Sequence, residues 1–146
     1  MIAIGCDHGG YILKEQIKQY LSDKNIEYKD FGTYSQESID YPDVAKPVCE
    51  AVVNGECKDG GILICGTGIG MSIAANKIKG IRAALCSNGY TAKMTKQHNN
   101  ANVICMGARV IGNEIAFDII DQWLNNDFMG GRHQNRLDKI DALENK

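Results

Sequence analysis

The chain has 146 residues and a formal net charge of −2, with its acidic and basic residues interspersed. This length predicts a single domain over residues 1–146 that buries about 70% of its unfolded surface. The balanced charge argues against nucleic acid or an anionic membrane as a partner, so any anionic ligand must be recognised locally. No apolar run approaches the roughly 20 residues that span a bilayer, and no signal segment opens the sequence, so we expect a cytoplasmic protein.

The six cysteines are widely spaced, and the chain has no CxxC pair and no HExxH motif. Disulfides need an oxidising compartment and structural zinc needs closely spaced ligands, so this pattern indicates six free thiols and no metal site. Four of the cysteines fall in or at the end of expected strands, where a cysteine commonly serves as a small buried hydrophobe. These are Cys6, Cys65, Cys86 and Cys105.

Short apolar runs alternate with helical patterns along the whole chain. The expected strands are 2–6, 27–31, 62–65, 81–86 and 103–106, and the expected helices are 11–23, about 42–54, one that includes residues 71–75, 88–97, 114–124 and 134–144. This alternation is typical of a parallel sheet that is covered by helices on both faces. We therefore predict an α/β fold, a Rossmann-like three-layer α/β/α sandwich with a five-stranded parallel sheet and an extra C-terminal helix.

Three of the helices carry further expectations. Pro47 is tolerable only in the first turn of its helix, because it lacks the N–H that an interior position needs. A wide stripe of apolar residues from Ile115 to Leu124 should be buried. The last helix has only a narrow stripe, so it covers either its own domain or a partner subunit. The narrow stripe consists of Leu137, Ile140 and Leu143.

The segment Gly60–Lys77 reads as a strand, a tight glycine turn and a helix. In such a unit the first free N–H groups of the helix point toward an anion above the strand end. The turn lacks the third glycine of a dinucleotide motif, since Met71 stands there, and it lacks the GK[ST] of a Walker motif. Cys65 and Thr67 instead place a thiol and a hydroxyl beside a site for a small anionic or enolate-like oxygen.

A cysteine at this position is a candidate base only with extra support. Turning an ordinary thiol mainly into thiolate at neutral pH needs about 2.7 kcal/mol, whereas a helix N-terminus typically supplies about 0.3–1 kcal/mol. Hydrogen bonds from backbone amides or from Thr67 would have to add the rest. From its position alone, Cys65 is therefore either a catalytic base or a structural core residue.

In open α/β sheets ligands bind at the carboxyl ends of the strands. Asp7 and His8, the turn after Cys65, the pair Ser87 and Asn88, and Arg109 should therefore converge there. Because Arg109 follows a buried strand, we expect a phosphate or carboxylate partner for its charge.

Two more groups lie elsewhere in the chain. His98 stands in an expected loop, where it is a candidate acid or base or else the cap of a helix. Arg132 and Arg136 are four residues apart, so they can grip one phosphate or simply form a solvated helix face.

With these residues identified, the whole chain resembles the type B ribose-5-phosphate isomerase family, which also includes galactose-6-phosphate and allose-6-phosphate isomerases. The matching segments occur in one order along the sequence. They are GCDHGG at 5–10, DYPD at 40–43, GGILICGTGIGMSIAANK at 60–77, GIRAAL at 80–85, QHNNANV at 97–103, GARV at 107–110 and GGRHQNR at 130–136.

The resemblance implies interconversion of an aldose phosphate and a ketose phosphate, with a phosphorylated sugar as the substrate and no metal or organic cofactor. It makes Cys65 the base between C2 and C1, Thr67 the relay for protons, and His98, assisted by Asp7, the group that opens the sugar ring. The remaining positions that match the family's substrate contacts are His8, Tyr41, Gly66, Gly68, Ile69, Gly70, Asn99, Arg109, Arg132 and Arg136. Some relatives instead place a glutamate base at the position of Met71, which cannot act as one.

The resemblance also implies a homodimer, or a dimer of dimers, with the site at the subunit interface. In this reading the neighbouring subunit contributes His98, Asn99 and Arg109. Two other readings stay open, a hexose 6-phosphate as the substrate and a non-catalytic module that binds sugar phosphates or, on the same fold, a flavin.

Overall fold

The structure is a computed structural model that describes residues 1–144. Its centre is a parallel sheet of five strands. The strands are β1 (Ile2–Cys6), β2 (Tyr28–Asp30), β3 (Gly61–Cys65), β4 (Ala83–Leu85) and β5 (Val103–Gly107), in the order β2-β1-β3-β5-β4. The register pairs Ile4 with Ile62 and Ile62 with Ile104 across the three central strands. The predicted parallel sheet is therefore confirmed, although β2 and β4 are shorter than their apolar runs.

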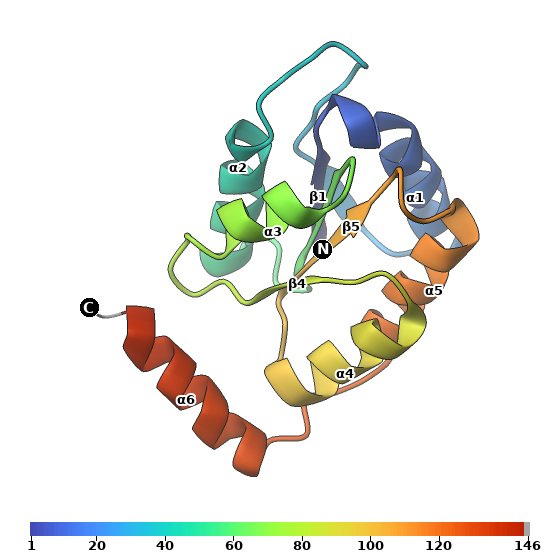
Figure 1. Ribbon diagram of the computed structural model, residues 1–146. Helices are drawn as coiled ribbons and strands as arrows, with labels where there is room; N and C mark the ends of the chain where they lie inside the picture. Colours follow the sequence, from blue (N-terminus) through green and yellow to red (C-terminus); the bar gives the residue numbers. More distant parts are fainter. Residues whose placement is uncertain (145–146) are drawn as a thin grey trace.

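Helices cover both faces of the sheet (Figure 1). One face packs against α1 (Tyr11–Asp23), α4 (Gly89–Asn99) and α5 (Asn113–Leu124), and the other packs against α2 (Pro42–Val53) and α3 (Ile69–Ala75). A short 3-10 turn, η1 (His8–Gly10), joins β1 to α1, and α6 (Arg132–Glu144) follows the sandwich. The three layers and the extra C-terminal helix agree with the predicted architecture.

The alternation of side chains along the three central strands explains why two core clusters form. Ile62 and Ile64 point to the face that carries α1 and α5, whereas Leu63 and Cys65 point to the face that carries α2 and α3. Because both faces are covered, all residues of β1, β3 and β5 are buried. Such strands read as continuous apolar runs, which is what the sequence shows.

The structure corrects the expectation for Pro47. Helix α2 begins at Pro42, so Pro47 lies in its interior and removes one N–H that would have bonded to the carbonyl of Asp43. Asp43 is exposed, so water can solvate its carbonyl, while Val44 and Val48 stay buried and hold the helix against the sheet. Packing of the buried face therefore outweighs the cost of the interior proline.

The wide stripe on α5 is also narrower than predicted. Ile119, Ile120 and Trp123 are fully buried, but Ile115 is 44% exposed. Position 115 lies in the first turn of the helix, near the edge of the α1 and α4 layer, so the neighbouring helices do not cover it.

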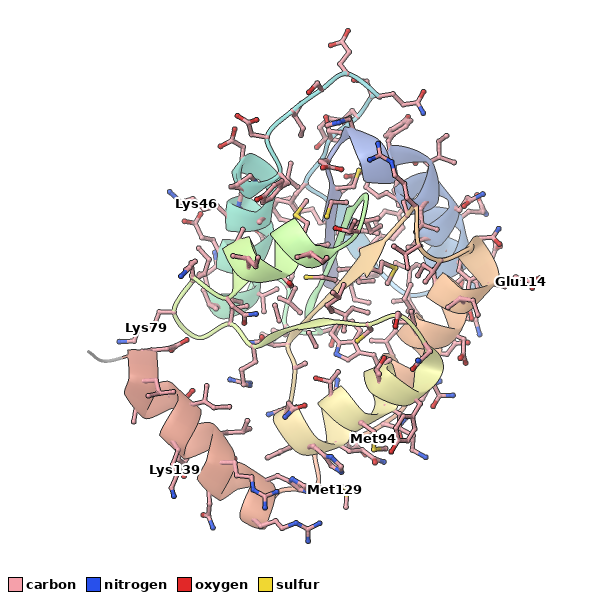
Figure 2. The ribbon with its side chains drawn as sticks, in the orientation of Figure 1. Lys46, Lys79, Met94, Glu114, Met129 and Lys139 are labelled. Carbon is pink, nitrogen blue, oxygen red and sulfur yellow. The ribbon has the colours of Figure 1, made fainter. Side chains whose placement is uncertain are left out.

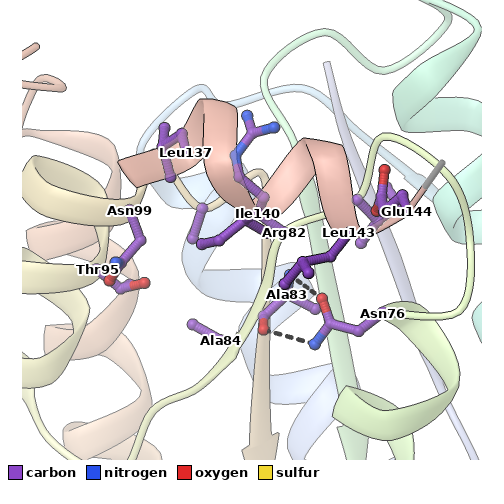
Figure 3. Close-up of a pocket in the computed structure, with 12 residues that line it drawn as sticks. Asn76, Arg82, Ala83, Ala84, Thr95, Asn99, Leu137, Ile140, Leu143 and Glu144 are labelled. Carbon is purple, nitrogen blue, oxygen red and sulfur yellow. Dashed lines mark hydrogen bonds between the residues drawn. The ribbon is translucent and has the colours of Figure 1, made fainter. Parts of the chain in front are cut away.

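Helix α6 lies at the margin of the molecule and begins two residues earlier than predicted (Figure 1). Leu137 packs into its own domain, whereas Ile140 and Leu143 are 44% and 63% exposed. These three side chains line one wall of a groove of about 450 Å³, with Arg82, Ala83 and Ala84 opposite them (Figure 3). Over residues 1–144, no helix combines the length and the hydropathy required of a membrane span.

Candidate active site

The ends of β1, β3 and β5 meet at the carboxyl edge of the sheet. A Cβ atom placed on Gly66 would lie 3.0 Å from a guanidinium nitrogen of Arg109, and one placed on Gly9 would lie 3.4 Å from Oδ1 of Asp7. The backbone N–H of Arg109 donates to the carbonyl of Gly66 at 3.0 Å, which ties the two turns together. The structure thus brings Asp7, Gly66 and Arg109 into one cluster, as the topology predicted.

Cys65 is the last residue of β3 and its side chain is 5% exposed. Its Sγ accepts a hydrogen bond from the backbone N–H of Gly68 at 3.0 Å. Gly68 has φ of +80°, and a Cβ there would lie 2.5 Å from Leu85, so only glycine allows this turn. The turn therefore aims a backbone donor at the sulfur atom, where it stabilises negative charge.

Thr67 is the exposed residue of the same turn. Its Oγ1 accepts a hydrogen bond at 3.2 Å from the N–H of Ile69, the first residue of α3. An accepting hydroxyl keeps its own proton available to a ligand above the turn. Position 67 thus supplies a hydroxyl donor next to Cys65.

The loop between β2 and α2 completes this side of the cluster. The N–H of Ile39 donates to Nδ1 of His8 at 3.3 Å, so a neutral His8 carries its ring proton on Nε2. The ring of Tyr41 lies against Gly70, since a Cβ at that glycine would be 2.7 Å from the ring. Tyr41 therefore stands beside the glycine turn, and His8 is bonded to the same loop that carries Tyr41.

A buried ion pair that the sequence pattern does not indicate holds this loop in place. Lys14 is fully buried, and its Nζ bonds to both carboxylate oxygens of Asp30 at 2.7 and 2.8 Å and to the carbonyl of Thr33 at 2.6 Å. Burial acts to raise the pKa of Asp30, but the hydrogen bonds from Lys14, Gly32 and Lys18 outweigh it and lower that pKa. Lys14 looks like an ordinary polar position in a helix, and only the fold reveals its partner.

Arg109 is exposed, which corrects the premise that its charge is buried; the expected phosphate or carboxylate partner stays a prediction. It follows a buried strand, but β5 ends at Gly107 and the chain turns outward at once. Among residues 1–144, no carboxylate forms an ion pair with its guanidinium. The side chain is therefore free to bind a dianionic ligand at the carboxyl edge.

A second basic group gathers at the junction of α4 and α6. His98 lies in the last turn of α4, and its ring stacks on that of His133 with the centroids 4.3 Å apart. Arg132 and Arg136 flank His133 on the first turns of α6, and both arginines are exposed. Figure 2 labels Met129, just before this junction, where α6 starts beside the end of α4.

This second group lies at the opposite edge of the sheet from Cys65. The carbonyl of Asn100, next to His98 and Asn99, accepts a bond from Arg82 at 3.0 Å, immediately before β4 begins. A five-residue strand such as β3 spans roughly 16 Å, so one chain does not bring His98 to Cys65. The expectation that His98 lies in a loop is wrong, because α4 extends to Asn99. Within one chain, His98 and Arg109 lie at opposite edges of the sheet.

Four of the other thiols are buried core groups with raised pKa values. Burial raises the pKa of Cys6 and of Cys49 to about 12, and that of Cys86 to about 11. The pKa of Cys105 is raised as well, mainly by burial and further by the neighbouring cysteines. All six cysteines are free thiols, as predicted, and these four are protonated core residues.

Two polar residues have roles that the sequence did not indicate. Asn88 was expected to lie with the ligand-binding residues, but its side chain caps α4 by accepting from the N–H of Thr91 at 2.8 Å. His133 was overlooked, although it stands between the two selected arginines. Within residues 1–144, no three side chains of His, Cys, Asp or Glu cluster closely enough to hold a metal ion.

A thiol, backbone donors and a basic side chain at the carboxyl edge of an open α/β sheet place the chain in the class of α/β proteins that bind a small ligand at this edge. The sequence profile of the family described as Ribose/Galactose Isomerase matches residues 2–140. The chain therefore belongs to the ribose/galactose isomerase family.

Named proteins of this kind are similar over nearly the full length. Ribose-5-phosphate isomerase B of Escherichia coli (strain K12) is 52% identical over 145 residues, which cover 99% of this chain and 97% of that protein. The solved structure of Clostridium thermocellum ribose-5-phosphate isomerase B is 54% identical, with a TM-score of 0.96 over 99% of this chain and 97% of the other. The structure of ribose-5-phosphate isomerase B from Mycoplasma genitalium with bound ribulose-5-phosphate is 44% identical, with a TM-score of 0.94 over 99% and 96%.

Proposed function

We propose that the protein interconverts ribose 5-phosphate and ribulose 5-phosphate through an enediolate, with Cys65 as the base. The observation that carries the proposal is the thiol at the end of β3, which accepts a hydrogen bond from Gly68 at the mouth of the glycine turn. Relatives that carry the name ribose-5-phosphate isomerase B support the choice of substrate. No organic or metal cofactor enters the proposal.

The reaction moves one proton between neighbouring carbons. The Cys65 thiolate removes the proton from C2 of the open aldose, the electron pair forms a C1–C2 double bond, and the carbonyl oxygen O1 becomes an oxyanion. The thiol then returns its proton to C1, while O1 gains a proton and O2 loses one to become the ketone. Backbone N–H groups of the turn from Gly66 to Gly70 stabilise the oxyanion, and Thr67 relays the proton between the two oxygens.

Ring opening and phosphate binding use the other residues. His98, assisted by Asp7, opens the sugar ring, and Asn99 and Tyr41 contact the sugar. Nε2 of His8 and the guanidinium of Arg109 point a hydrogen-bond donor and a positive charge at the phosphate from the Cys65 side. Arg132 and Arg136 grip the same phosphate from the other side.

These groups belong to opposite edges of one chain, so the proposal requires a second copy. In a two-fold dimer, the α4 and α6 junction of one subunit completes the Cys65 site of the other, and the dimer holds two sites. The half-exposed Ile140 and Leu143 on α6 offer apolar surface for such contacts. We propose a homodimer or a dimer of dimers. Six free thiols suit a reducing compartment, and we propose the cytoplasm.

The test compares kcat/KM for ribose 5-phosphate, allose 6-phosphate and galactose 6-phosphate in the wild type and in Cys65→Ala. Cys65→Ala should lose at least about 10³-fold in turnover of the preferred substrate, because no other group can move the C2 proton. Its binding of a phosphate ligand should stay nearly intact. Near-normal turnover in this variant would rule out the cysteine base.

A hexose 6-phosphate is the alternative substrate, and the family description, which includes galactose isomerases, favours it as the second candidate. The substrates differ by one carbon, so the distance between the phosphate clamp and Cys65 decides between them. A higher kcat/KM on either hexose phosphate would select this alternative. Binding of all three sugars without turnover would instead indicate a non-catalytic module.

A further inference from the structure

His133 is a buried polar residue to which neither the resemblance nor the proposed reaction gives a role. Only 5% of it is exposed, and its Nε2 is buried without a hydrogen-bond partner among residues 1–144. Buried polar atoms are nearly always satisfied, so an unpaired one costs stability that a nonpolar residue would not. The presence of a histidine at position 133 is therefore not explained by its contribution to the stability of the fold.

The ring of His133 stacks on the ring of His98. The two rings are stacked, with their centroids 4.3 Å apart and their planes within 11° of parallel. His98 remains partly exposed, so one face of its ring is covered while the rest can reach a ligand. An imidazole without such a neighbour rotates broadly about its terminal torsion, because that torsion has no sharp staggered minima.

The backbone around the stack is fixed on both sides. The N–H of Met129 donates to the carbonyl of Gln97 at 3.0 Å, and the side chain of Gln97 donates to that of Asn126 at 3.2 Å. The N–H of His133 donates to the carbonyl of Gly130 at 3.1 Å. Both rings thus stand on anchored segments, and the stack joins α4 to α6.

The charge state of His133 suits a residue that packs against the His98 ring and not one that binds an anionic group. Burial lowers its pKa, and electrostatic interaction with His98, Arg132 and Arg136 lowers it further. His133 is therefore neutral at neutral pH and offers a flat aromatic face without adding a third positive charge beside the two arginines.

We propose that His133 is a positioning residue, whose stacked ring holds the His98 imidazole in the plane needed to open the sugar ring. The inference rests on the proposed function, because His98 has that task only there. Proton transfer in ring opening needs a heavy-atom distance of about 2.6–3.2 Å, which a rotating imidazole meets only part of the time. His133 itself touches neither the substrate nor the reacting atoms, and it acts through His98 alone.

Rates measured from the aldose and from the ketose distinguish a role in ring opening from a general loss of activity. Ribose 5-phosphate is mostly cyclic and has to be opened before Cys65 can act. Ribulose 5-phosphate cannot close a furanose ring, because the oxygen that would close it carries the phosphate. Loss of the platform should therefore slow turnover of the aldose and leave proton exchange at C1 of the ketose unchanged.

The experiment uses the full-length protein with His133→Ala, His133→Leu and His133→Phe. Turnover of ribose 5-phosphate is measured by steady-state kinetics, and loss of the C1 proton of ribulose 5-phosphate in D₂O is followed by NMR. His133→Ala and His133→Leu should slow aldose turnover at least about tenfold and change the exchange rate less than about twofold. His133→Phe keeps an aromatic face, so both rates should stay within about threefold of wild type.

Gln134→Ala, one position along α6, is the matched control and should change neither rate. Unchanged aldose turnover in His133→Leu would overturn the inference, and so would equal losses in turnover and exchange. His133→Phe as slow as His133→Leu would show that the nitrogens matter and not the stack, which also overturns it. The proposed function fails separately, if the wild type does not exchange the C1 proton or if Cys65→Ala still does. Leucine retains the volume of the site, so the test survives if the alanine variant does not fold.

Discussion

The proposed shared site predicts that two inactive variants can restore each other. One variant is Cys65→Ala, which removes the base at the carboxyl edge of the sheet. The other is the double substitution Arg132→Ala and Arg136→Ala on α6, which removes one side of the phosphate clamp. If each site combines Cys65 of one subunit with the arginines of the other, a mixed dimer contains one intact site and one doubly defective site.

The size of the effect follows from the geometry. A hydrogen bond to a charged group contributes about 1.5–3 kcal/mol, so losing both arginines should cost about 3–6 kcal/mol, or about 10²–10⁴-fold in kcat/KM. Each variant alone should then show almost no turnover at substrate concentrations close to the wild-type KM. After equimolar mixing, random pairing makes half of the dimers mixed, so about one quarter of all sites are intact.

The assay is turnover of ribose 5-phosphate after the two variants are unfolded and refolded together. We expect about one quarter of wild-type specific activity from the mixture and almost none from either variant refolded alone. The matched control mixes Cys65→Ala with Arg109→Ala. Arg109 lies beside Gly66 in the same chain, so this pair regenerates no intact site and should show no recovery. Recovery of activity in the control mixture would refute the proposal that each site combines residues of two subunits. The absence of recovery in the first mixture would refute it as well.

Two further predictions concern the described side chains. At pH 8, iodoacetamide should leave Cys6 and Cys49 unmodified in the folded protein. A pKa of about 12 leaves only about one thiol in 10⁴ as the reactive thiolate at that pH. The prediction would be contradicted if mass spectrometry showed either cysteine alkylated before Cys65. Lys14→Met removes the fully buried cation that bonds to both oxygens of Asp30 and leaves Lys18 as the cation paired with that carboxylate. This change should cost about 1.5–3 kcal/mol, or about 3–12 °C in melting temperature, whereas Lys29→Met, in an exposed pair, should cost less than about 1 kcal/mol. The folded-state pKa of Asp30 is lowered, so its ionised form stabilises the fold above about pH 4, and the difference between wild type and Lys14→Met should shrink as the pH falls below that value. Equal melting temperatures of the Lys14 and Lys29 variants at neutral pH would count against the buried pair.

The sheet was predictable because its signal is local. Strands β1, β3 and β5 are buried on both faces, so their sequences are continuous apolar runs of the right length. The edge strands β2 and β4 are shorter than their runs, because each pairs with only one neighbour and loses partners at its ends. Apolar pattern alone does not report how far a neighbouring strand extends.

The turn at Cys65 was predictable for the same reason, and the buried network beneath it was not. The glycine pattern indicates a backbone donor near the thiol, and the structure supplies it from Gly68. Lys14 and Asp30 are far apart in the sequence, and their ion pair depends on how α1 lies against β2. Pro47 shows the same limit, since the burial of Val44 and Val48 decides the length of α2. These features arise from tertiary packing, which overrides local propensity.

The division of the candidate site follows from the direction of the chain in a parallel α/β fold. Each helix runs back antiparallel to the strands, so residues at the end of a helix lie at the amino edge of the sheet, and residues at the end of a strand lie at the carboxyl edge. Cys65 and Arg109 follow strands, whereas His98 and Asn99 end α4. Arg109 and His98 are close in sequence, with only β5 between them, and for that reason they are separated by the length of that strand. The proposed site needs both kinds of residue and so cannot close within one such domain; under that proposal, a two-fold dimer is the smallest assembly that would give every Cys65 a His98.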